Sequence, residues 1–276
     1  MVADPDAALP APAEHHSPHH RARVVDLQGK EHGTVALPLA FSSTVRPDLI
    51  RKAVDATRSH RRQPYGASPT AGLRHSVEWS GKGRGVARTP RLMDSMTGAQ
   101  APNTVGGRAA HPPKVERIWT KKINTKERRL AFASALAATR VVPLARARGH
   151  RLPEEARLPI VVADGVEKIE TSREARDLLE RLELWSDVER AHDGTHVRAG
   201  RGKRRNRMRR TPRGVLVVTS APRRARGFRN LPGVEVVTAH RLDTEHLAPG
   251  GDPGRLTLFS HAAIETLRER LGEERA

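Results

Sequence analysis

The chain has 276 residues, and 50 Lys and Arg against 31 Asp and Glu give it a net charge of +19. Nucleic acid is the commonest polyanion that neutralises such a surplus, because each bound Lys or Arg releases a condensed counterion. The absence of cysteine excludes disulfides, thiol nucleophiles and cysteine-based zinc sites. We expect neither a secretory signal nor a membrane span, since no apolar run approaches the roughly 20 residues that a span requires. These features predict a cytoplasmic, nucleic-acid-binding protein.

Residues 1–22 are rich in Ala, Pro and His and contain almost no large apolar side chain. We therefore expect a disordered N-terminal extension, because the segment cannot recover its ordering entropy by burial. The extension contains four histidines: His15, His16, His19 and His20. Incidental metal affinity is the favoured interpretation of this group, because no carboxylate cluster completes a site. We predict no metal site and no other cofactor.

The segment 23–58 begins with two short apolar runs, Val24–Leu27 and Thr34–Leu37, on either side of a glycine-containing turn. This pattern predicts a hairpin or two edge strands. A helix should follow, with Pro47 in its first turn and apolar residues at helical spacing. Its expected buried stripe consists of Leu49, Ile50, Ala53 and Val54.

Residues 59–115 form the least regular part of the chain. Between residues 58 and 115 there are eight Gly, six Pro and ten Lys or Arg, but only two acidic residues. Irregular segments longer than about 12–15 residues are uncommon in compact domains and are either functional or disordered. Large side chains such as Tyr65 and Trp79 argue against a flexible linker. We therefore expect an extended loop that becomes ordered inside a partner.

Residues 23–58 and 116–276 are expected to form one globular α/β domain. Asn124 and Glu127 have the spacing of a capping box and predict a helix that ends near Thr139. Strands and helices then alternate, with strands at 160–163, 215–219, 234–239 and 256–259 and helices at 171–184 and 260–271. Continuous Val, Ile and Leu are typical of strands buried on both faces. We predict an α/β fold with a doubly wound, largely parallel sheet, flanking helices and a long extended internal loop.

Charge is distributed unevenly over the predicted domain. From Glu154 to Asp193 there are 12 acidic and six basic residues, which we interpret as ordinary solvated surface. From Arg198 to Arg213, nine of the 16 residues are Lys or Arg and none is acidic. Arginine binds phosphate through two donors and stacks on bases, so the run is interpreted as an RNA-docking face. A flexible charged loop or a localisation signal is the alternative.

Catalytic motifs give no support for an enzyme. Gly81–Gly85 resembles a phosphate cradle but lacks the P-loop spacing, and Val86 stands where a dinucleotide fingerprint needs glycine. No G-x-S-x-G or H-E-x-x-H motif is present. Asp164 follows a predicted strand, as catalytic acids often do, but capping of a turn with Gly165 is the simpler interpretation. We expect a non-enzymatic protein without a small-molecule substrate.

Several segments occur in one order along residues 24–271 and resemble a known family. They are Pro47–Ile50, Arg62–Gly66, Ala71–Arg74, Gly81–Gly85, Gly106–Lys114, Ser134–Ala138, Arg148–His150, Arg198–Lys203, Arg229–Gly233 and Leu247–Leu256. On these segments the chain resembles the large-subunit ribosomal protein L-four family, in its archaeal and eukaryotic type. The resemblance implies a structural constituent of the large ribosomal subunit that binds ribosomal RNA and supports assembly. It also implies that the loop at 59–115 lines the nascent-peptide exit tunnel beside ribosomal protein L-twenty-two.

The predicted RNA contacts fall in two groups. Those in the loop are Arg61, Arg62, Lys82, Arg84, Arg88, Arg91, Arg108 and Lys114. Those in the basic run are Arg198, Arg201, Lys203, Arg204, Arg205, Asn206, Arg207, Arg209 and Arg210. Tyr65 and Trp79 are candidates for stacking on unpaired bases, although Trp79 fits a small packed cluster equally well. A sequence-tolerant nucleoid protein is the alternative that charge alone allows.

Overall fold

A computed structural model describes residues 21–272 as two compact units, one of residues 21–57 and 122–272 and one of residues 58–121. The expectations for the N-terminal extension, including its four histidines, concern residues outside this range. Arg21 and Ala22 are described and already belong to the first strand. No helix in the described range is long and apolar enough to cross a membrane.

The larger unit is built on a six-stranded sheet with the order β2-β1-β5-β10-β8-β9. Its strands are β1 (Arg21–Val25), β2 (Glu31–Ala36), β5 (Ile160–Val162), β8 (Leu216–Thr219), β9 (Glu235–Thr238) and β10 (Thr257–Ser260). β1 and β2 form an antiparallel hairpin, and all other neighbouring pairs are parallel. The predicted hairpin and largely parallel sheet are therefore confirmed.

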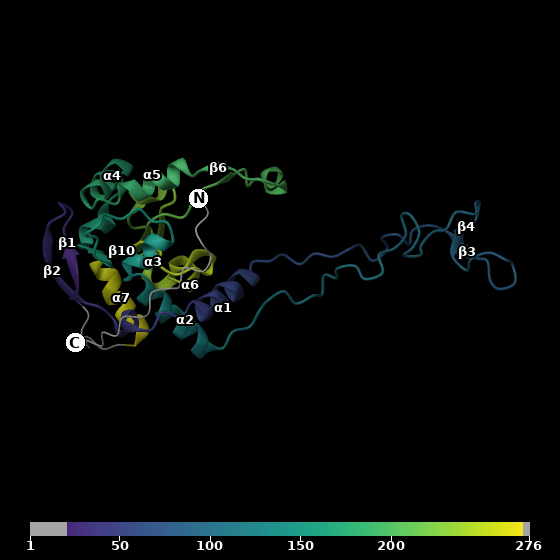
Figure 1. The fold of residues 1–276 in the computed structure, drawn as a ribbon, viewed down its shortest axis with the longest axis horizontal. Helices are drawn as coiled ribbons and strands as arrows, with labels where there is room; N and C mark the ends of the chain where they lie inside the picture. Colours follow the sequence, from purple (N-terminus) through teal and green to yellow (C-terminus); the bar gives the residue numbers. More distant parts are fainter. Residues whose placement is uncertain (1–20, 273–276) are drawn as a thin grey trace. The chain divides into compact units, whose positions relative to one another are not determined.

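Helices cover both faces of this sheet (Figure 1). The α-helices are α1 (Pro47–Ser59), α2 (Thr125–Ala138), α3 (Val142–Ala147), α4 (Ser172–Arg181), α5 (Trp185–Asp193), α6 (Thr244–Leu247) and α7 (His261–Leu271). Short 3-10 turns lie at Leu39–Ser42, Asp164–Lys168, Arg201–Arg205, Arg226–Asn230, Ala239–Arg241 and Pro249–Gly251. Alternation of strands and helices along the chain gives the doubly wound α/β fold that the sequence predicted.

The core consists of two apolar clusters, one on each face of the sheet. Leu216 and Val218 of β8 belong to the cluster that includes residues of α1, α2 and α7, whereas Val217 belongs to the cluster with α4 and α5. Successive side chains of a strand point to opposite faces, so a continuous apolar strand serves both clusters. This arrangement explains why β8 consists of Leu, Val, Val and Thr, all of them buried.

The two N-terminal helix predictions are confirmed in position and corrected in detail. In α1, Ile50, Ala53 and Val54 are buried as expected, but Leu49 is only half-buried. Asn124 is the N-cap of α2, yet its side chain makes no capping hydrogen bond. The Glu127 carboxylate instead pairs with Lys52 Nζ of α1 at 2.8 Å, so a contact between helices replaces the expected capping box.

The helix expected at 171–184 is α4, which ends three residues earlier than predicted, and the following helix α5 was not predicted. Thr171 Oγ1 accepts a hydrogen bond from Glu174 N at 3.3 Å, which confirms the predicted cap of α4. The helix ends at Arg181, and Glu183 adopts a left-handed conformation (φ 57°) before α5 starts at Trp185. Residues 182–184 contain neither Gly nor Pro, so no residue type marks where α4 ends and α5 begins.

The smaller unit, Arg58–Lys121, contains a two-stranded antiparallel hairpin of β3 (Val77–Trp79) and β4 (Pro90–Leu92), which was not predicted. Of its residues only Ser59, Pro90 and Ala99 are buried. Two segments approach closely at Gly72 (φ 74°), where a Cβ would lie 2.5 Å from the backbone nitrogen of Arg108. The unit is thus held by turns and backbone contacts rather than by an apolar core.

Candidate nucleic-acid interface

The basic run of the sequence forms a short hairpin on the larger unit. β6 (His196–Val197) pairs antiparallel with β7 (Arg209–Arg210), and the 3-10 turn Arg201–Arg205 lies between them. We call residues 196–210 the basic hairpin. Asn206 ends the turn in a left-handed conformation (φ 57°), and Arg198 N donates to Met208 O at 2.7 Å.

Most of the predicted contacts on the basic hairpin are exposed. The exposed ones are Arg201, Lys203, Arg204, Arg205, Asn206, Arg207, Arg209 and Arg210. Arg198 is half-buried, and its Nε donates to Arg207 O at 3.2 Å across the hairpin. Within the described range none of these cations forms an ion pair with a carboxylate. Their mutual repulsion is therefore uncompensated in the free protein, and phosphate groups would relieve it.

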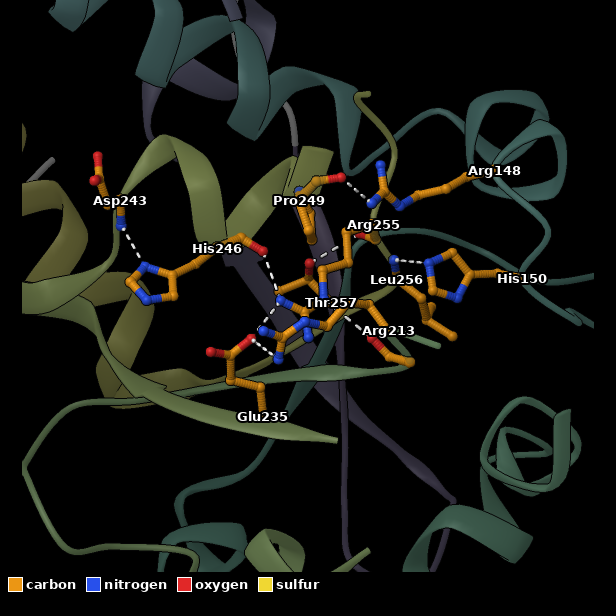
Figure 2. A network of polar contacts seen from close by, with 11 residues as sticks. Arg148, His150, Arg213, Glu235, Asp243, His246, Pro249, Arg255, Leu256 and Thr257 are labelled. Carbon is orange, nitrogen blue, oxygen red and sulfur yellow. Dashed lines mark hydrogen bonds and ion pairs between the residues drawn. The ribbon is translucent and has the colours of Figure 1, made fainter. Parts of the chain in front are cut away.

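A buried polar network fixes the segment that follows the basic hairpin (Figure 2). Arg190 Nη2 donates to Arg213 O at 3.0 Å, and Arg255 Nε donates to Gly214 O at 3.0 Å. Arg213 Nη1 also lies 3.2 Å from Glu235 Oε2. Three contacts thus hold the chain where the hairpin joins β8.

Arg255 and Glu235 form the centre of this network. The fully buried Arg255 donates from Nη1 to Glu235 Oε2 at 2.9 Å and to His246 O at 2.8 Å. Burial lowers the pKa of Arg255 to about 10 against the opposing effect of Glu235, so the guanidinium stays charged at neutral pH. Burial alone would raise the pKa of Glu235, but the attraction of Arg255 outweighs it and the pKa is lowered.

Asp187 of α5 carries a second buried charge. Its carboxylate accepts hydrogen bonds from His150 Nδ1 at 3.0 Å, Arg190 Nε at 2.9 Å and Arg151 N at 3.1 Å. Desolvation opposes ionisation of Asp187, but the bonds from His150 and Arg190 prevail and lower its pKa. His150 Nε2 accepts from Leu256 N at 3.2 Å, which assigns the ring proton to Nδ1. The acidic stretch expected to be solvated surface therefore supplies a buried anion.

The Asp187–His150 pair is structural rather than catalytic. A general base needs a free ring nitrogen beside a nucleophile, and the backbone N–H of Leu256 occupies Nε2 here. Asp164 is structural as well, because its Oδ1 accepts from Ala262 N at 2.7 Å in the first turn of α7. In the described range no group of three His, Asp or Glu is placed to hold a metal ion.

The predicted contacts of the smaller unit are dispersed along it. Lys82, Arg84 and Arg88 are exposed in the connection between β3 and β4. The exposed residues Arg61, Arg62, Arg108 and Lys114 lie outside this hairpin. Arg91 lies in β4, is half-buried and donates from Nη1 to Met96 O, which ties a turn within the unit. The connection also contains Gly81, Gly83 and Gly85, each with a positive φ, so it exposes backbone as well as cations.

The two predicted stacking residues differ in their surroundings. The exposed ring of Trp79 in β3 makes no ring contact within the described range. Tyr65 stacks on Trp119, with ring centroids 5.3 Å apart. Sequence reasoning missed Trp119, although it lies between Arg117 and Lys121, and an aromatic residue among basic ones is a signal of nucleic-acid binding.

The larger unit is an α/β domain that exposes arginines without carboxylate partners on its described residues, a charge pattern typical of nucleic-acid-binding proteins. A family model described as "Ribosomal protein L4/L1 family" matches residues 35–270. Proteins named "Large ribosomal subunit protein uL4" are similar over nearly the whole chain. That of Methanopyrus kandleri is 46% identical over 258 residues, 91% of this chain and 99% of that protein.

Two further relatives with the same name give the same picture. The protein of Halorubrum lacusprofundi is 48% identical over 249 residues, 90% of this chain and 99% of that protein. That of Pyrobaculum aerophilum is 47% identical over 256 residues, 91% of this chain and 90% of that protein. The chain belongs to the ribosomal protein L4/L1 family, which confirms the resemblance found in the sequence.

Proposed function

We propose that this chain is a structural constituent of the large ribosomal subunit in the cytoplasmic ribosome, where it binds ribosomal RNA and contacts neighbouring ribosomal proteins. The observation that carries the proposal is the basic hairpin, whose exposed cations have no carboxylate partner in the described range. The names of the family's members support the same assignment. The protein acts by positioning RNA and neutralising charge, and it catalyses no reaction.

The loop at 59–115 is proposed to enter the ribosomal RNA. A segment becomes ordered only where the burial of its side chains offsets the conformational entropy that it loses. The smaller unit, which contains this loop, buries very few side chains. Exposed apolar residues such as Met93, Met96 and Val105 accompany its cations. A partner must therefore bury the apolar side chains and neutralise the cations. Folded RNA supplies stacked bases for the first and phosphates for the second. We propose further that the loop lines the peptide exit tunnel, beside ribosomal protein L-twenty-two and the passing nascent peptide.

Deletion of residues 62–115 tests this proposal. Both apolar clusters consist of residues outside the deleted segment, so the larger unit should keep its circular-dichroism spectrum and cooperative unfolding. Assembly of large subunits or passage of nascent chains should be impaired, as measured by sucrose-gradient profiles and translation rates. Normal assembly and translation with the shortened chain would contradict the proposed role of the loop.

A second measurement separates ribosomal RNA binding from general attraction to polyanions. The full-length chain should bind a transcript of the large-subunit ribosomal RNA more tightly than duplex DNA at equal ionic strength. Non-specific affinity depends on phosphate charge alone, whereas specific affinity also uses shape and unpaired bases. Equal affinities would favour the nucleoid alternative.

A further inference from the structure

Four side chains from the two ends of the smaller unit form one stacked assembly. The rings of Tyr65 and Trp119 have centroids 5.3 Å apart and an interplanar angle of 23°. The guanidinium carbons of Arg117 and Arg62 lie 4.4 and 5.3 Å from the centroid of the Trp119 ring. We call these four residues the aromatic–arginine cluster.

The four side chains of the cluster contact one another and still leave groups available to a ligand. Tyr65 is 60% exposed, so its ring is available for a further stacking partner. Neither Arg62 nor Arg117 pairs with a carboxylate in the described range. The indole Nε1 of Trp119 is buried and has no acceptor among the described residues, which is unusual for a native buried donor. The exposed ring of Tyr65 and the guanidinium groups of Arg62 and Arg117 are the groups of the cluster that a further partner can reach.

We propose that the aromatic–arginine cluster is a binding site for one unpaired RNA nucleotide, whose base stacks on the exposed face of Tyr65. The phosphates that flank this nucleotide contact Arg62 and Arg117. This inference rests on the proposed ribosomal RNA binding and specifies one site of it. The base extends a stack that is already formed, so little side-chain entropy is lost on binding. An arginine that lies over an aromatic ring still has N–H groups free to donate to phosphate.

The contacts favour Tyr65 over Trp79 as the stacking residue. Trp79 is 65% exposed, but no ring or arginine stacks on it in the described range. A purely structural clasp is the competing explanation for the cluster, because Ala67 N also donates to Pro113 O at 3.0 Å between the same two segments. A clasp explains the contact between Tyr65 and Trp119. It does not explain two arginines without carboxylate partners beside an exposed ring.

Binding of the full-length chain to an in vitro transcript of its large-subunit ribosomal RNA tests the site. Tyr65→Leu should raise Kd by roughly 5- to 150-fold, the range expected for one base–aromatic stack. Tyr65→Phe should bind like the wild type, and Trp79→Leu is the matched control for loss of an exposed ring. Tyr65→Leu should leave the salt dependence unchanged, whereas Arg62→Gln should reduce its slope by roughly 0.7–0.9.

Crosslinking at 254 nm distinguishes the site from a clasp. In the wild-type complex, nucleotide adducts should appear on the tryptic peptide Gln63–Arg74, which contains Tyr65, rather than on His75–Lys82, which contains Trp79. Adducts on His75–Lys82 alone, or an affinity of Tyr65→Leu equal to that of the wild type, would overturn the proposed site. A preference of the wild type for ribosomal RNA over duplex DNA would still support the proposed function in that case. Absence of that preference in the wild type would overturn both.

Discussion

The substitution Asp187→Asn tests how much the buried charge of Asp187 stabilises the larger unit. The carboxylate is fully buried and accepts three hydrogen bonds, from His150 Nδ1, Arg190 Nε and Arg151 N. Asn keeps the size and one acceptor oxygen, but it turns an NH2 group toward donors and leaves Arg190 without its counter-charge. Loss of one partner of a buried ion pair costs roughly 3–5 kcal/mol. We therefore expect the free energy of unfolding to fall by about that amount, a large share of the roughly 5–15 kcal/mol of an ordinary domain.

Urea unfolding of the full-length protein, followed by circular dichroism, measures this loss. Asp193→Asn is the matched control, because Asp193 lies in the same helix, is exposed and, among the described residues, pairs with His192 Nδ1 alone, at 3.3 Å. Surface substitutions of this kind change stability by about 0.5 kcal/mol or less. A loss below about 1 kcal/mol for Asp187→Asn would refute the reasoning, because such a value is typical of an exposed ion pair.

Two further predictions concern charge. The first replaces four exposed arginines of the basic hairpin with glutamine: Arg204, Arg205, Arg207 and Arg209. Filter binding at several salt concentrations should show weaker RNA binding and a slope reduced by roughly 0.7–0.9 per lost phosphate contact, whereas an unchanged slope would mean that the hairpin does not touch phosphate. The second concerns stability in acid. In the folded state the pKa values of Asp187 and Glu235 lie below their ordinary values of 3.8 and 4.5. The two carboxylates therefore stabilise the fold above the ordinary values, and this contribution is lost as the pH falls through the lowered folded-state values. The urea midpoint should therefore drop in acid below these values, and a midpoint that stays constant there would contradict the assignment.

Local patterns were sufficient to predict the elements of the sheet and most of the helices. The continuous apolar run of β8 predicted a strand buried on both faces, and Pro47 marked the first turn of α1. Thr171 predicted the start of α4, because its side chain and the backbone it caps are only three residues apart. These signals depend on residues that are close in the sequence, so they can be read from a local sequence pattern.

Predictions failed where distant residues decide the outcome. Glu127 has the spacing of a capping box, but it pairs with Lys52, which lies 75 residues away. In the sequence Asp187 is one of many acidic residues in an acidic stretch, and only the fold places His150 beside it. Whether a charged residue is solvated or buried depends on the packing of other elements, which composition does not specify.

The candidate site shows the same division. The density of arginine in the basic run identified the basic hairpin directly, whereas the turn that leaves Asn206 in a left-handed conformation was not predictable. Tyr65 is predictable as a candidate stacking residue, because it is an aromatic side chain in the irregular loop. Its partner Trp119 lies 54 residues further along the chain, and only the close approach of the two ends of the smaller unit unites them.

Limited trypsin digestion of purified large subunits washed in high salt is the most direct test of the central claim, that ribosomal RNA neutralises the cations of both units. The chain should remain with the washed particle. Cleavage after Lys82, Arg84 and Arg205 should be much slower than in the free protein, because phosphates and packed RNA cover these exposed residues. Complete particles that lack the chain, or cleavage at these positions as fast as in the free protein, would contradict the account.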